Sequence, residues 1–214
     1  MSFAASDLGA RTRREAEHEA LLEKWLADLR ARDPRVVVLR KGESRFCRVL
    51  DRALRIVTFG KQDRFLTSYT TTLGRRIYVP DDWERYPAGD RLCILRHELV
   101  HVRQFRRLTF PGMALVYLFL PLPFGFAAGR AFLEWQGYRE TLAATWQVHG
   151  RAAAYDPGLH AEIVKRFTGP DYAWMWVPGA MVRRAIQREL ARLERSPPAD
   201  RTLGTPTNCG SSAT

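Results

Sequence analysis

The sequence predicts an α+β fold in one domain, formed by residues 1–195, with a tail at 196–214. Three observations support this class. An amphipathic helical pattern occupies about 7–32, short β-branched runs lie between positions 36 and 80, and long helical patterns return from position 90 onward. A chain of 214 residues is long enough to bury a sizeable core. The tail is rich in Pro, Gly, Ser and Thr, which predicts disorder.

The N-terminal part contains one helix and two strand candidates. Leucines and a tryptophan recur at helical spacing over about 7–32, and Asp33-Pro34 ends this pattern. Residues 36–39 form a short β-branched run, and residues 54–59 form a second one. Both runs predict strands of a small sheet.

The region 67–80 has the clearest strand pattern. Its threonines, together with Ile77 and Tyr78, favour extended backbone, and Gly74 marks a bend. Residues 81–84 then predict a short helical turn that leads into the next helix.

The helix predicted from position 90 carries a His-Glu-x-x-His pattern, with Asp90 as its N-cap. His97 and His101 are one helical turn apart, so both imidazoles leave the same face. They can bind one Zn²⁺ and leave positions for a third ligand and a water. Glu98 is closer in angle to His101, which lets it act on that water without binding the metal itself. Gln104 returns to the same face.

A structural role is the alternative for both histidines, as core residues that bond backbone carbonyls. The surrounding helix is strongly apolar. Burial of His and Glu side chains in such a helix costs free energy unless they are paired or bound to a metal. We therefore favour a metal site.

The segment 108–129 has no charged residue. Its length and apolarity alone would suit a membrane span. However, Pro111, Pro121 and Pro123 divide it, and a single span would place the helices of one metal site on opposite sides of the membrane. We favour a buried connection or loop. A hydrophobic hairpin near a membrane surface is the alternative.

Residues 131–150 predict a helix on which Glu134, Tyr138 and Thr141 share one face. The small Gly137 would let this helix approach the histidine helix closely. A carboxylate early in a helix is also favoured by the helix dipole, without any role as a ligand.

The C-terminal part predicts a turn at 155–158, a short helical piece at 162–167 and a basic helix at 181–195. An aromatic cluster at 172–176 lies between these helices. Its Tyr172 could donate a hydrogen bond to an oxyanion, although such clusters more often pack in a core.

The formal net charge is +11. Such an excess suits an acidic substrate, an anionic membrane face or nucleic acid, or it reflects a solvated, Arg-rich surface. No recognition-helix, zinc-finger or RNP-like pattern accompanies the charge, so we expect no specific nucleic acid.

Cysteine usage points to a reducing compartment. Cys47, Cys93 and Cys209 are odd in number and far apart, which does not suit a disulfide framework. The first ten residues lack the basic and apolar regions of a signal peptide. We expect a cytoplasmic protein, with peripheral membrane association through 108–129 as the alternative.

The stretch from position 90 to about 140 resembles the active-site region of zincin metallopeptidases, because the HExxH pattern lies in an apolar helix. In gluzincins the third zinc ligand is a glutamate on a downstream helix, so the resemblance implies Glu134. Near it, Gly137-Tyr138 does not reproduce the fuller signature of any one gluzincin family. The position of a third ligand is weakly constrained, which keeps four alternatives open: Glu140, His149, Asp156 and His160.

In zincins an edge strand precedes the active helix and binds the substrate backbone by strand addition. The strand that ends at Pro80 has the matching place, and the resemblance implies that its free edge binds peptide. Thr71, Thr72, Tyr138 and Tyr172 are the candidates for substrate contact. A plain sheet strand is the alternative.

The resemblance thus implies a zincin-like single domain with a small sheet, an active-site helix and a following helix that bears a ligand. It implies a zinc-dependent peptidase for a peptide or protein substrate. Zn²⁺ would polarise the scissile carbonyl, and Glu98 would act as general base toward the water. Two alternatives are a zinc-bound regulator without turnover and a membrane-surface protein in which the HExxH pattern is structural.

Overall fold

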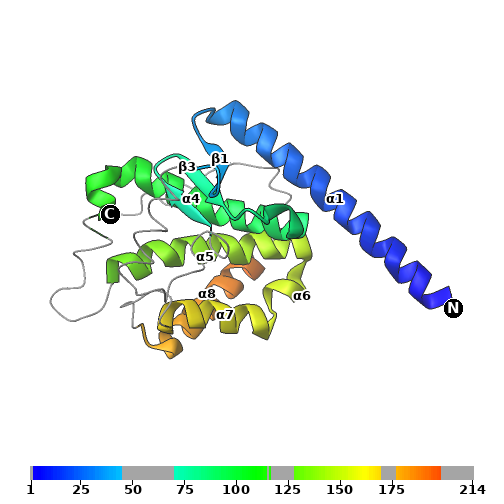
Figure 1. Cartoon of the computed structure of the whole chain (residues 1–214). Helices are drawn as coiled ribbons and strands as arrows, with labels where there is room; N and C mark the ends of the chain where they lie inside the picture. The colour runs from blue at the N-terminus through cyan, green and yellow to red at the C-terminus, as the bar shows by residue number, and fades with distance from the viewer. Residues whose placement is uncertain (1, 45–69, 115, 117–127, 170–176, 199–214) are drawn as a thin grey trace, which may run out of the picture.

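The computed structural model describes residues 2–44, 70–114, 116, 128–169 and 177–198 (Figure 1). These residues form long helices and a small three-stranded sheet, which confirms the α+β class. The predicted strand at 54–59, Tyr172, Cys47 and Cys209 lie outside the described residues. Within those residues, none of the helices has the length and apolarity needed to cross a membrane.

The first helix, α1 (Ser2–Arg32), confirms the amphipathic pattern of the N-terminal part. Leu22 and Trp25 lie on the side of α1 that is buried against the rest of the chain. Asp33 follows the helix, and its carboxylate pairs with Arg75 and Arg106, both at 3.1 Å. The end of α1 is therefore attached to the sheet and to a later helix.

The sheet contains β1 (Val37–Arg40), β2 (Thr71–Leu73) and β3 (Arg76–Val79) in the order β1-β3-β2. β3 is parallel to β1 and antiparallel to β2. Gly74, with a φ of 62°, makes the tight turn of the β2–β3 hairpin. The predicted free edge of the strand ending at Pro80 is wrong, because both edges of β3 are paired. Among the described strands, β2 carries the outer edge on that side.

The helix that bears the HExxH pattern is α4 (Ala88–Ala114), which follows a short 3₁₀ turn, η1 (Trp83–Arg85). The predicted N-cap at Asp90 is wrong because the helix starts earlier. The backbone N–H of Ala88 donates to the Glu15 carboxylate of α1 at 2.7 Å. A side chain distant in sequence thus satisfies one of the N–H groups that every helix start leaves unpaired.

In the part of the chain that the structure describes, four helices follow: α5 (Ala128–His149), α6 (Arg151–Ala154), α7 (Pro157–Thr168) and α8 (Gly179–Arg195). The expected helices at 131–150 and 181–195 are confirmed within a few residues. The expected turn at 155–158 is a turn at Tyr155, and its last two residues are the start of α7. The Asp156 side chain caps that helix by accepting from the N–H groups of the second and third residues after it.

Two hydrophobic clusters stabilise the fold. One lies between α1, the sheet, η1 and α4, and the other between α5, α6, α7 and α8. α4 and α5 run side by side between them (Figure 1). The boundary between the two clusters is therefore the interface of α4 and α5, and it holds buried polar side chains: Glu98, His101, Gln104 and Glu134.

Candidate metal centre

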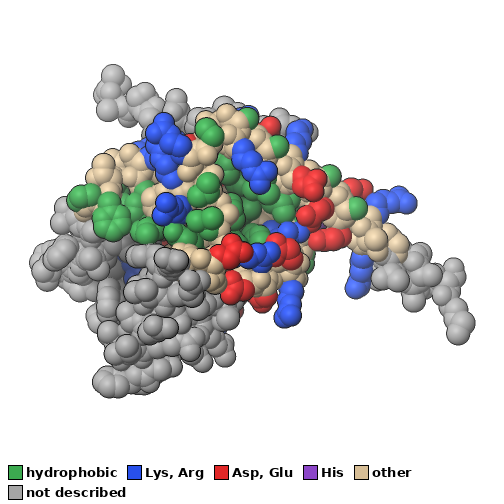
Figure 2. All heavy atoms as spheres, turned by 45° about the horizontal axis from the view of Figure 1, so that its top comes forward, with side chains coloured by type: hydrophobic (Ala, Val, Ile, Leu, Met, Phe, Trp, Pro, Cys, Tyr) green, Lys and Arg blue, Asp and Glu red, His purple; other side chains and the backbone are tan. Residues whose placement is uncertain are grey.

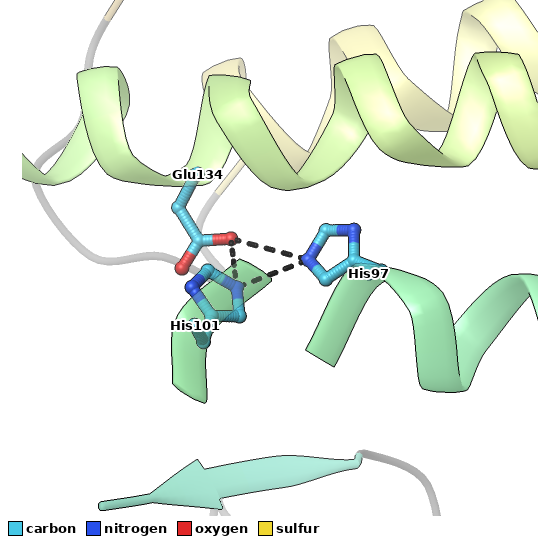
Figure 3. A group of neighbouring side chains, drawn as sticks. All are labelled: His97, His101 and Glu134. Carbon is cyan, nitrogen blue, oxygen red and sulfur yellow. Dashed lines mark hydrogen bonds and ion pairs between the residues drawn. The ribbon is translucent and has the colours of Figure 1, made fainter. Parts of the chain in front are cut away.

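Three predicted ligands meet at the α4–α5 interface (Figure 3). The Nε2 atoms of His97 and His101 lie 3.1 Å apart. The Oε2 atom of Glu134 lies 3.9 Å from the first and 3.8 Å from the second. This group could hold one metal ion, with all three donor atoms within 4.8 Å of one another. Glu134 lies in the second turn of α5 rather than the predicted first turn, because the helix begins at Ala128.

A glycine permits the close approach of the two helices. A Cβ atom at Gly137 would lie 2.6 Å from Cε1 and 2.7 Å from Nε2 of His97. Such a contact is far inside van der Waals distance, so the His97 ring occupies the space that any other residue at 137 would fill.

Hydrogen bonds orient the His97 ring. Its Nδ1 lies 3.0 Å from Oγ1 of Thr141, and that hydroxyl donates to the carbonyl of Gly137 at 3.2 Å. Because the hydroxyl proton is used there, Thr141 accepts from the Nδ1–H of His97. The lone pair of His97 is then on Nε2, which faces the other two donors. Burial, followed by the nearby His101, holds the pKa of His97 well below its usual value.

The same arrangement occurs at His101. Its Nδ1 lies 2.9 Å from Oε1 of Gln104, and the Nε2 of Gln104 donates to the carbonyl of Leu133 at 3.0 Å. Gln104 thus accepts from His101, which leaves the lone pair of His101 on Nε2 as well. Two lone pairs at 3.1 Å, beside a buried carboxylate, repel one another unless a proton or a cation lies between them. The donor set therefore fits a metal cation, and such hydrogen bonds to the far ring nitrogen are usual for histidine ligands.

Glu98 lies next to this group on α4 and is buried. Its Oε2 accepts a hydrogen bond of 2.7 Å from Oγ1 of Thr72 on β2. Burial raises the pKa of the Glu98 carboxyl, while His101 and the Thr72 hydroxyl act in the opposite direction. Thr72 is also a predicted substrate contact, and its hydroxyl bonds Glu98 in the structure.

A cleft of about 360 Å³ opens beside His97 and Glu98. Tyr138, one of the predicted substrate contacts, lines it, and its ring lies 5.0 Å from that of His97. From the start of β2, Thr70 reaches the cleft rather than the predicted Thr71. The other lining residues are mostly apolar and include Pro80, Trp83, Tyr86, Ile94, Leu159 and Ile163.

The four alternative third ligands have other partners. Glu140 accepts from Arg96 at 2.7 Å, and His149 pairs with Asp90 at 3.0 Å. Asp156 caps α7, and Nε2 of His160 lies 2.9 Å from the carbonyl of Ala154. Glu134 alone among the five candidates faces the two histidines in the described part of the chain.

The sequence analysis did not assign the supporting roles of Thr141, Gln104 and Thr72. For Gln104 a signal existed, because it follows His101 by three residues and so lies on the same face of α4. No local signal links Thr72 to Glu98, since the two meet only through the packing of the sheet on α4.

A scan against protein-family models and searches of curated proteins and of solved structures found no match to this chain. The function is therefore inferred from the site itself.

Proposed function

We propose that this protein is a zinc-dependent metallopeptidase of the zincin type, with His97, His101 and Glu134 as metal ligands. One observation carries this proposal. Two imidazole lone pairs and a buried carboxylate converge from two helices, directly beside a second buried carboxylate that is not part of the group. Three protein ligands with nitrogen and oxygen donors are typical of catalytic zinc, since a structural site closes all four positions.

Zinc bound there would supply Lewis acidity, which lowers the pKa of water and polarises a carbonyl. Glu98 supplies the proton transfers. It takes a proton from the attacking water and delivers it to the leaving amine as the C–N bond breaks, so that OH joins the acyl half and H the amine half. A carboxylate held beside the attacking water can accept the proton and pass it on in turn. Thr72 holds the carboxylate in place.

The lining of the cleft predicts which substrate side chain the site would prefer. Its walls carry aromatic and aliphatic side chains from η1, α4 and α7, and it opens beside His97 and Glu98. We expect a large apolar side chain next to the scissile bond to bind there. The substrate backbone would extend along the outer edge of β2 and pair with it as an added strand.

The test combines metal analysis with peptide cleavage. We expect about one zinc per chain in the wild-type protein. His97→Ala and His101→Ala should lose that zinc, and His160→Ala, whose ring bonds a backbone carbonyl away from the site, should keep it. Glu98→Gln should keep zinc and lose cleavage of a peptide library by about 10²–10⁴-fold.

Two results would contradict the proposal in different ways. A wild-type protein that contains no zinc, or two histidine variants that contain as much zinc as the wild type, would contradict the metal site. A wild-type protein that binds zinc but cleaves no peptide would exclude the peptidase function and favour a zinc-bound regulator.

A further inference from the structure

Two phenylalanines stand out on the described surface. The side chains of Phe110 and Phe132 are 64% and 63% exposed, the highest values among the large hydrophobic residues described. Phe110 lies near the end of α4, just after the kink at Thr109, and Phe132 lies in the first turns of α5. Exposed apolar side chains that gather in one patch, rather than singly, mark sites of contact with a membrane or another protein.

The two phenylalanines lie at the same end of the molecule. The amide nitrogen of Gln104 donates to the carbonyl of Leu133 and lies 3.3 Å from Oε1 of Gln136. These contacts place the start of α5 beside the last regular turns of α4. The ring of Phe105 stacks on that of Phe110 at 6.4 Å. In Figure 1 the end of α4 and the start of α5 both lie at the left, opposite the N-terminal end of α1.

A kink near the end of α4 turns Phe110 away from the helix axis. Thr109 has a φ of 58°, a region that β-branched residues rarely adopt, and Pro111 follows it. The chain therefore leaves the direction of α4 at Phe110, and the ring projects into solvent instead of continuing along the helix.

Three arginines precede Phe110 on α4. Arg103, Arg106 and Arg107 are exposed on the last turns of α4 before the kink. Arg106 pairs at 3.1 Å with Asp33, which follows α1, and Glu140 of α5 acts electrostatically on Arg103. Figure 2 shows hydrophobic and Lys or Arg side chains close together at the left end of the molecule.

We propose that this basic–aromatic end, formed by Arg103, Arg106, Arg107, Phe110 and Phe132, docks on the surface of an anionic lipid bilayer. Aromatic side chains partition into the interface of a membrane, and nearby arginines attract acidic headgroups. Phe110 lies within the stretch from Leu108 to Gly129, which has no charged residue, and Phe132 follows that stretch closely in the sequence.

The docking does not depend on metal binding or peptidase activity, so binding alone tests it. The full chain is mixed with phosphatidylcholine vesicles, with or without a minority of phosphatidylglycerol, and the bound fraction is measured by sedimentation. We expect binding to the anionic vesicles that weakens as salt is raised, and little binding to the neutral ones.

Matched variants locate the contact. Phe110→Ser with Phe132→Ser should lower the partition coefficient at least about tenfold, because the variant has no aromatic rings at these positions to transfer from water into the bilayer. Phe110→Leu with Phe132→Leu keeps apolar side chains and should retain most of the binding. Arg103→Gln with Arg107→Gln should lower binding about tenfold.

The charge control lies on the distant half of α1. Arg13→Gln with Arg14→Gln removes the same charge from exposed positions there and should leave binding almost unchanged. Equal binding of the serine, leucine and wild-type proteins would overturn the proposal, as would equal effects of the two arginine pairs. The proposal would also be overturned, in favour of a nucleic-acid contact, if DNA displaced the protein from the vesicles and the serine variants bound DNA as well as the wild type does. Circular dichroism checks that each variant is folded.

Discussion

The His97 ring is held by contacts that leave it little freedom. Gly137 lies directly against one side of the ring, and Thr141 accepts from its Nδ1–H. The Tyr138 ring meets it edge-on at 5.0 Å. A candidate ligand whose position is set by a missing side chain is sensitive to a single added methyl group.

Gly137→Ala should therefore weaken zinc binding without changing a ligand. The new Cβ would lie 2.6 Å from Cε1 of His97, so the ring or the helix must shift. We expect zinc affinity to fall about 10–100-fold, as for other changes that misplace a histidine ligand. Competition with a chromophoric chelator measures it. Gly9→Ala, with nothing within 4 Å of the added Cβ, is the control, and equal zinc affinity in both variants would contradict the contact.

The hydroxyl of Thr72 provides a second residue-scale prediction. Thr72→Val keeps the shape of the side chain but removes the 2.7 Å hydrogen bond to Glu98. Zinc content should be unchanged, and peptide cleavage should fall about tenfold because the Glu98 carboxylate loses its orientation. Thr72→Ser should restore most of the activity. Loss of zinc in the valine variant would show that Thr72 supports the fold of the site rather than Glu98.

At the scale of elements, the start of α4 is attached to two neighbouring helices. The carboxylates of Glu15 and Glu19 on α1 bond the Ala88 N–H and the Arg91 guanidinium. On the other side, Asp90 of α4 pairs with His149 at the end of α5 at 3.0 Å. These contacts fix the rotation of α4, and hence the direction in which its histidines point.

The Asp90–His149 pair predicts a pH dependence of stability. The contact with the Asp90 carboxylate, and then that with Cys93, raises the pKa of His149 from 6.5 to about 10. The folded state therefore favours protonated His149. The pair's stabilisation is complete below about pH 6.5 and is lost as the pH rises through about 10.

Asp90→Asn should lower the free energy of unfolding by about 1 kcal/mol near pH 6, a value reduced by the solvent exposure of Asp90. The difference from wild type should disappear above about pH 10. Urea unfolding at several pH values measures it. Glu19→Gln is the control, because its arginine partner does not titrate in this range and its effect should not vary with pH. An Asp90→Asn effect that is constant with pH would contradict the pair.

At the scale of the whole molecule, the candidate metal centre lies at the boundary of two hydrophobic clusters. α4 belongs to the cluster with α1 and the sheet, and α5 belongs to the cluster with α7 and α8. Two ligands come from the first helix and one from the second. A metal ion there would connect the two halves of the fold.

Zinc should therefore stabilise the whole chain. At a free concentration about 1,000 times its Kd, a ligand that binds only the folded state adds about 4 kcal/mol. For a chain of this size that corresponds to a rise in Tm of about 8–16 °C. Differential scanning fluorimetry with zinc and with a chelator measures the shift. His97→Ala should show none, and a wild-type Tm that is the same under both conditions would contradict the site.

The sequence by itself determined the local structure and the helical spacing of the two histidines. The spacing of His97 and His101 places two imidazoles on one helical face whatever the fold, because helical geometry is local. Apolar periodicity likewise determined α1, α5 and α8 to within a few residues, and the α+β class followed from the order of helical and strand patterns.

Tertiary packing decided the features that join distant positions. The choice of Glu134 over Glu140, the cap of α4 by Glu15 instead of Asp90, the central place of β3 and the bond from Thr72 to Glu98 each depend on how elements rotate and approach one another. No local pattern encodes those distances. They result from the burial of two hydrophobic clusters on either side of α4 and α5, which brings the ligands together only once the chain is folded.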